Sequence, residues 1–175
     1  MEAVRDNLKF SLVAWPETGV RCDFVLPPAA LSSFLGPDLF EPGSDASPPP
    51  RLTTSVRGHF DLQLIGRRLK VKGIFAVKAE LTCSRCLTVF AGKVGDSIDE
   101  TVDLLDEGVG ADDQWEGFVA VSNGRFDLTP FLGELFWLSW PVKALCRPDC
   151  AGLCPVCGAN LNEAPCRCRG ETTRH

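Results

Sequence analysis

The sequence predicts an α+β fold, in which a strongly bent antiparallel sheet or partly closed barrel carries one long C-terminal helix and a cysteine-rich tail. Apolar and polar residues alternate over 56–64 and again over 69–83, as in paired strands that bury one face. Large apolar residues follow Thr129-Pro130, which is a favourable helix start. Six of the nine cysteines lie between positions 146 and 168. We therefore expect a sheet domain with a packed helix over 1–144 and a tail over 145–175.

Composition and charge narrow the class of protein. The 175 residues are 45% hydrophobic and 23% charged, which supports one folded domain with a small appendage. A net charge of −5 and a pI near 5.0 argue against a protein that grips nucleic acid by bulk electrostatics. Because the N-terminus has no apolar signal core and no stretch suits a bilayer span, we expect a cytoplasmic protein without membrane contact.

The first fifty residues carry weaker patterns. Residues 7–15 alternate well enough for a first strand, and residues 22–26 suit a short second strand. Two prolines then precede a predicted helical turn over 29–35. Residues 41–50 are rich in Pro and Ser, so we expect an exposed loop there.

The clearest pattern is a long hairpin. The two alternating runs are separated by Gly66-Arg67-Arg68, which suits a turn between antiparallel strands. Gly58 and Gly73 interrupt the apolar faces, as expected of a strongly bent sheet or partly closed barrel. Further strand patterns follow over 87–104.

A Cys-x-x-Cys pair, Cys83 and Cys86, stands where the second strand of this hairpin is interrupted. Three interpretations compete: half of a metal site completed from the tail, a thioredoxin-like redox pair, or two packed thiols at a bend. The redox interpretation requires the first cysteine at a helix N-terminus. Strand patterns on both sides count against that arrangement, and packed thiols are the favoured interpretation.

Charge is segregated along the chain. Residues 51–78 carry seven Lys or Arg and one acid, whereas residues 96–116 carry nine acids and no Lys or Arg. Residues 106–116 form an acidic loop that lacks the ligand order of an EF-hand. Such a chain has one face for anions and another for cations, but the alternative is that each run is merely a solvated face, which is the commoner case for charge runs. The candidate partner-binding residues are Arg67, Arg68, Lys70 and Lys72 for RNA, and Asp103, Asp106, Glu107, Asp112 and Asp113 for a basic protein.

The long helix should begin near Thr129, with Thr129 or Asp127 as its N-cap and Pro141 beyond its end. Apolar residues occur nearly all round it, so we expect it to be covered on more than one side. The simplest role is to plug the open face of the sheet. Trp137 is also a candidate contact for a partner.

The tail cysteines suit a metal. Cys154-Pro-Val-Cys157-Gly is a tight turn that points two thiolates at one spot, and Cys166-Arg-Cys168 is the nearest second pair. We predict one zinc ion held by these four cysteines, with Cys146 or Cys150 as substitutes, so that a small cysteine-rich zinc knuckle completes the fold. Disulfides are the alternative, but they require an oxidising compartment.

Three further motifs stand out: Leu-Thr-Cys83-Ser-Arg-Cys86-Leu after a long strand, then Asp127-Leu-Thr-Pro-Phe-Leu-Gly-Glu134-Leu leading to Trp140-Pro141-Val-Lys, and then Cys150-Ala-Gly-Leu-Cys154-Pro-Val-Cys157-Gly-Ala-Asn160-Leu-Asn162 with Cys166-Arg-Cys168. Together they resemble the YceD family, associated with accumulation of large-subunit ribosomal RNA. The resemblance covers roughly residues 55–168 and is most specific in the tail.

The resemblance implies a non-enzymatic bacterial or plastid factor that supports synthesis, processing or stability of 23S ribosomal RNA. Its expected partner is a large-subunit ribosomal protein or the 23S rRNA precursor, with no small-molecule substrate.

The competing class is an enzyme. With no Gly-rich phosphate loop, two histidines and no tyrosine, only a thiol–disulfide redox protein using Cys83 and Cys86 remains as the alternative.

Overall fold

The computed structural model describes residues 4–34, 51–106 and 118–170. The chain divides into two compact units. The sheet unit comprises Met1–Ala79 and Lys93–Trp140, and the cysteine unit comprises Glu80–Gly92 and Pro141–His175. Residues 80–92 therefore group with the tail, whereas the sequence-based division separates them from it. Among the described residues, no helix combines the length and apolar composition needed to cross a bilayer.

The predicted hairpin is confirmed as β3 (Val56–Ile65) and β4 (Arg68–Thr82), which pair antiparallel. Along β4, every second residue from Leu69 to Leu81 faces the interior, and the residues between them are exposed or half-buried. This alternation is the pattern expected of a strand that buries one face. The turn between the strands uses Gly66, whose φ of 64° lies in the left-handed region.

The sheet has the order β1-β8-β7-β6-β4-β3-β2, and β5 (Val89–Val94) pairs with β4 outside this path. The remaining strands are β1 (Lys9–Ser11), β2 (Val20–Leu26), β6 (Ser97–Asp106), β7 (Phe118–Ser122) and β8 (Arg125–Asp127). The prediction of a purely antiparallel sheet is wrong at one place, because β6 and β7 run parallel. Residue alternation reports which side chains face inward and carries no information on strand direction.

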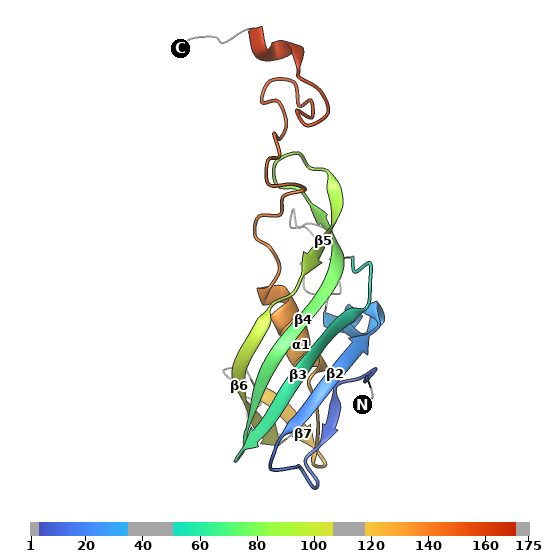
Figure 1. The fold of residues 1–175 in the computed structure, drawn as a ribbon, viewed down its shortest axis with the longest axis vertical. Coiled ribbons are helices and arrows are strands. Elements are labelled where there is room, and N and C mark those ends of the chain that lie inside the picture. Colours follow the sequence, from blue (N-terminus) through green and yellow to red (C-terminus); the bar gives the residue numbers. More distant parts are fainter. Residues whose placement is uncertain (1–3, 35–50, 107–117, 171–175) are drawn as a thin grey trace. The chain divides into compact units, whose positions relative to one another are not determined.

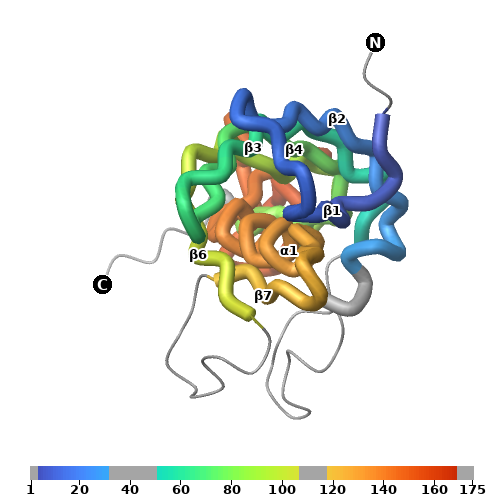
Figure 2. The backbone as a smooth tube through the Cα atoms, turned by 90° about the horizontal axis from the view of Figure 1, so that it is seen from below, coloured from blue at the N-terminus to red at the C-terminus, as the bar shows by residue number. Residues whose placement is uncertain are grey.

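The N-terminal segment supplies one end strand of this order, β1, and also contacts the strand at the other end, β2. Arg5 pairs with Phe24 of β2, and β1 pairs with β8. In Figure 2 the strands curl around the helix α1 (Thr129–Leu138), as expected of the strongly bent sheet. The predicted first strand is shorter than expected: β1 has three residues, and Ala14 beyond it takes a φ of 56°. A 3₁₀ helix, η1 (Pro28–Phe34), stands where the helical turn is predicted, and a second, η3 (Arg167–Gly170), lies in the tail.

Helix α1 fills the concave side of the sheet (Figure 1). Leu132 and Phe136 are fully buried, and Phe24 and Phe60 pack with ring centroids 4.9 Å apart in the same core. Leu128 is the N-cap residue, and the Asp127 carboxylate accepts a hydrogen bond from the Thr129 backbone N–H. The predicted caps are therefore displaced by one residue. The loop predicted over 41–50 lies wholly outside the described residues, and so does the loop predicted over 106–116 except for Asp106.

Gly73 lies where two strands approach too closely for a side chain. It pairs with Phe60, and a Cβ atom there would overlap the carbonyl oxygen of His59. We expect Gly73→Ala to lower the free energy of unfolding by about 1–3 kcal/mol, as for other overpacked sites. Gly66→Asn is the matched control, because nothing lies within 4 Å of a Cβ on Gly66 and Asn tolerates positive φ. Urea denaturation of both variants checks this, and equal stability of Gly73→Ala and the wild type would contradict it.

Candidate metal centres

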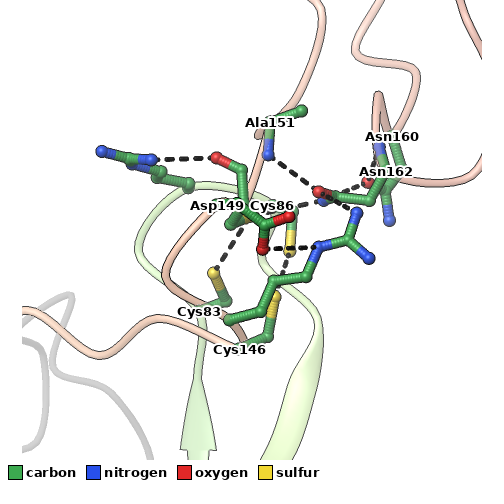
Figure 3. Close-up of polar contacts among 10 residues, drawn as sticks. Cys83, Cys86, Cys146, Asp149, Ala151, Asn160 and Asn162 are labelled. Carbon is green, nitrogen blue, oxygen red and sulfur yellow. Dashed lines mark hydrogen bonds and ion pairs between the residues drawn. The ribbon is translucent and has the colours of Figure 1, made fainter.

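Four cysteines from two distant segments converge in the cysteine unit. The sulfurs of Cys83, Cys86, Cys146 and Cys150, here called the first tetrad, all lie within 4.8 Å of one another. The Cys83 and Cys150 sulfurs are 3.7 Å apart, and those of Cys86 and Cys146 are 3.6 Å apart (Figure 3). Phe90, Leu145 and Leu153 pack around this cluster.

The turn between β4 and β5 presents the first two of these thiols. Leu87 N–H donates to the Cys83 carbonyl, and Cys83 N–H donates to the Thr88 carbonyl, so the chain closes tightly over residues 83–88. Leu87 takes a φ of 58° to complete the turn. Two contacts then hold the tail segment beside it. Ser84 N–H donates to the Ala144 carbonyl, and the Arg85 guanidinium donates to the Cys150 carbonyl at 2.9 Å.

The tail cysteines form a second tetrad of Cys154, Cys157, Cys166 and Cys168, whose sulfurs also lie within 4.8 Å of one another. Gly158 takes a φ of 72° and donates its N–H to the Cys154 carbonyl, which closes a tight turn that contains both Cys154 and Cys157. Val156 N–H points at the Cys154 sulfur at 3.4 Å. This tetrad is more open than the first, since Cys157 is exposed and Cys166 and Cys168 are half-buried.

Both tetrads fit a metal ion bound through sulfur. A tetrahedral ion with bonds of about 2.3 Å to sulfur places its ligand atoms about 3.8 Å apart. The closest sulfur pairs, at 3.3 to 3.7 Å, come near this spacing. All nine cysteines lie in the described part of the chain, and none is in a disulfide. Two clusters of four thiols could therefore each hold a metal ion.

The thiol pKa values within each tetrad diverge. Burial acts to raise the pKa of Cys83, but backbone amides of Cys146, Cys86 and Arg85 outweigh it and lower that pKa to about 6. Burial raises the pKa of Cys146 to about 12. In the second tetrad, backbone amides of Cys157 and Val156 lower the pKa of Cys154 to about 7, while the contact with Cys157 raises the pKa of Cys168 to about 11. A metal ion must displace protons from the thiols of raised pKa, so binding strengthens as pH rises.

The structure groups the predicted cysteines differently in one respect. The four tail cysteines come together as expected, but Cys146 and Cys150 do not lie with them as substitutes. They lie instead with Cys83 and Cys86, for which packed thiols were the favoured interpretation. The Cys-x₃-Cys spacing of 146 and 150 could have indicated a second ligand pair. Cys22, in β2, is buried in the sheet unit and belongs to neither tetrad.

Over the described residues, the basic run and the acidic run do not form separate faces, so the expectation is wrong for this part of the chain. Strands β4 and β6 are neighbours, and their register sets Arg68 opposite Asp103 and Lys72 opposite Asp99. Ion pairs follow this register: Arg67–Asp106, Arg68–Asp103, Lys70–Asp99 and Lys72–Asp99. Lys70 and then Lys72 lower the pKa of Asp99. Acids and bases thus neutralise one another on one exposed surface. Glu107, Asp112 and Asp113 lie outside the described residues.

Trp137 lies at the end of α1, beside an apolar groove of about 1150 Å³ in the sheet unit. Its ring is 5.8 Å from that of the buried Phe136 and 6.2 Å from that of Trp140. Phe118, Phe131 and the largely exposed Leu138 also line the groove. Trp137 therefore packs in an aromatic cluster and also faces a groove, and its role toward a partner stays a prediction.

The protein has a unit in which a curled sheet surrounds one helix and a second unit with two candidate metal centres of four cysteines each. Residues 71–175, which are 105 of the 175 residues, match the family described as Large ribosomal RNA subunit accumulation protein YceD. The chain belongs to the YceD family, which confirms the resemblance seen in the sequence. The matched segment contains all eight cysteines of the two tetrads.

The relatives are distant. The uncharacterized protein Rv2926c of Mycobacterium tuberculosis is 28% identical over 104 residues, which are 59% of this chain and 50% of that protein. The uncharacterized protein ML1660 of Mycobacterium leprae is 24% identical over 104 residues, 59% of this chain and 48% of that protein. The chain spans about half the length of these curated relatives.

A plant relative carries a descriptive name. The chloroplastic Large ribosomal RNA subunit accumulation protein YCED homolog 1 of Zea mays is 37% identical over 46 residues, 26% of this chain and 16% of that protein. No solved structure matches the chain.

Proposed function

We propose that this chain is a non-enzymatic cytoplasmic factor that supports 23S ribosomal RNA synthesis, processing or stability and large ribosomal subunit assembly. The observation that carries this proposal is membership of a family described by accumulation of the large ribosomal RNA subunit. The chain acts in this role as a binding protein, with the sheet unit as its main folded body and the cysteine unit held by metal ions.

Zinc is the metal that the two tetrads suit best. Four cysteine thiolates are the ligand set of closed structural zinc sites, and such sites leave no coordination position open for a substrate. Each tetrad offers four sulfurs within 4.8 Å of one another. Zinc therefore has a structural role in this proposal, in line with a non-enzymatic protein.

The direct partner in this proposal is a basic large-subunit ribosomal protein, with the 23S rRNA precursor as the competing target. The chain carries 23 acids against 18 Lys and Arg, so its long-range field attracts a basic protein and repels a phosphate backbone. Arg67, Arg68, Lys70 and Lys72 are all paired with one of three carboxylates, Asp99, Asp103 and Asp106, so most of this basic charge is already neutralised and little is left for phosphate contacts.

The partner can be tested by capture from a cell lysate with and without RNase. We expect ribosomal protein to remain bound after RNase treatment. Asp103→Asn with Asp106→Asn should slow association roughly tenfold, because steering charge is lost. Arg67→Gln with Arg68→Gln is the matched control, since it breaks the same two ion pairs and makes the chain more acidic. Release by RNase together with loss of capture in the Arg variant would instead identify RNA as the target.

The redox alternative has one supporting observation, the lowered pKa of Cys83, about 6. However, Cys83 lies in a turn between two strands, without the helix N-terminus that activates thioredoxin-like thiols. We expect the zinc-loaded protein to show no reduction of insulin disulfides. Turnover above that of a Cys83→Ser variant would favour the redox function.

A further inference from the structure

Asn162 lies in the loop that joins the two ligand pairs of the second tetrad, yet its side chain reaches the first tetrad (Figure 3). Its Nδ2 lies 3.3 Å from the Cys150 sulfur and 2.8 Å from the Asn160 side-chain oxygen. Asn162 is not itself a member of either tetrad. The contact nevertheless joins a loop of one candidate centre to a ligand of the other.

The neighbours of Asn162 settle which end of its amide faces the sulfur. Its Oδ1 accepts hydrogen bonds from the Arg147 guanidinium at 2.7 Å and from the Ala151 backbone N–H at 2.8 Å. Both neighbours are donors, so they require the oxygen on that side. The amide N–H group therefore points at Cys150, and the sulfur is the acceptor.

An N–H donor at this sulfur favours metal binding. Four thiolates around a divalent cation leave a net charge of −2, and hydrogen bonds to the sulfurs disperse that charge. Asn162 also holds Arg147 and Ala151, which stand on either side of Cys150 in the tail segment. Its side chain thus orients one ligand and supports the backbone around it.

The loop that carries Asn162 begins and ends at cysteines of the second tetrad. It runs from Cys157 to Cys166. Two backbone hydrogen bonds fix its position: Cys154 N–H donates to the Ala159 carbonyl, and Leu161 N–H donates to the Gly152 carbonyl. Asn160 also accepts from Asn162 N–H and donates to Glu163, which rigidifies the turn. An ion that joins the four tail cysteines would hold both ends of this loop and keep Asn162 in place.

We propose that Asn162 couples the two tetrads, so that a metal ion in the second tetrad raises the metal affinity of the first, and the reverse. This inference rests on the proposed metal sites and adds a positioning residue between them. Such coupling is reciprocal, since each ion stabilises the same contact. Loss of an outer-shell partner of a metal ligand costs about 10–100-fold in affinity, which sets the size of the expected effect.

Native mass spectrometry of the full chain, titrated with zinc and a competing chelator, tests the coupling. We expect the wild type to change from the metal-free form to the form with two bound ions, with little of the form that holds one ion. Asn162→Ala should accumulate the one-ion species and lower the first tetrad's affinity about tenfold. Glu163→Gln, in the same loop, is the matched control and should behave as the wild type, because it keeps an acceptor for Asn160.

A double-mutant comparison separates coupling from simple packing. With Cys157→Ser and Cys168→Ser the second tetrad is disabled, and the cobalt–thiolate absorption of the first tetrad reports its affinity directly. In that background Asn162→Ala should change the affinity by less than about twofold.

Asn162→Asp in the intact chain keeps the oxygen for Arg147 and Ala151 but removes the N–H from Cys150. It should lose at least as much affinity as Asn162→Ala.

Two results would overturn the coupling: an Asn162→Ala titration identical to that of the wild type, or an equal loss of affinity in both backgrounds. Retained affinity in Asn162→Asp would show that the amide oxygen alone matters and would likewise count against it. Failure of the metal sites themselves would look different, because neither the wild type nor any variant would then bind zinc.

Discussion

Removal of both metal ions is expected to unfold the cysteine unit and leave the sheet unit standing. The first tetrad has a small apolar surround of Phe90, Leu145 and Leu153, too little to stabilise a unit of this size without cross-links. Structural zinc sites of this type contribute apparent binding free energies of about 10–16 kcal/mol at neutral pH. Residues 80–92 and 141–170 should therefore lose their hydrogen-exchange protection when a chelator strips the protein.

Hydrogen–deuterium exchange with chelator, followed by zinc re-addition, measures this directly. We expect two zinc ions per chain before chelation and full recovery of protection after re-addition. Cys22→Ala is the matched control, because this cysteine is buried in β2 and belongs to neither tetrad. Protection that persists over 80–92 in protein shown to be metal-free would contradict the prediction. A stoichiometry of one would return the protein to the single-site prediction made from the tail.

Phe136→Ala is expected to produce the opposite pattern. This side chain is fully buried in α1, with its ring 5.5 Å from Trp140 and 5.8 Å from Trp137. Truncation of a buried Phe costs about 3–5 kcal/mol, a large fraction of the 5–15 kcal/mol that stabilises an ordinary domain. The sheet unit should unfold at much lower urea concentration, while the zinc content stays unchanged.

Tryptophan fluorescence reports on the sheet unit alone, because all four tryptophans fall within its sequence. Leu138→Ala, on the same helix but 82% exposed, is the control and should change stability by no more than about 0.5 kcal/mol. If Phe136→Ala also released zinc, the two units would not be independent, and the division of the chain would need revision.

Much of the fold could be predicted from local sequence patterns. The β3–β4 hairpin and the single long helix could be predicted because both follow from periodicity within one segment. The tail tetrad could be predicted for the same reason, since its four cysteines lie within 15 residues, from Cys154 to Cys168. Family membership also followed from short motifs, each readable without any knowledge of tertiary contacts.

Other features depend on contacts between distant segments. The sequence placed basic and acidic runs apart, but the β4–β6 register sets them side by side as ion pairs. Cys83 and Cys86 find their partners 60 or more residues later, at Cys146 and Cys150. The parallel pairing of β6 with β7 is equally invisible to alternation.

The sequence by itself therefore determined which side chains of the β3–β4 hairpin face inward, that the helix begins near Thr129, and that Cys154, Cys157, Cys166 and Cys168 are close together. Only the tertiary structure decided that the first Cys-x-x-Cys belongs to a second cluster, that the charged runs neutralise each other, and that Asn162 reaches Cys150. The physical reason is that side-chain periodicity is a property of one segment. Pairing between segments is chosen by strand register and packing over the whole unit, which no single segment encodes.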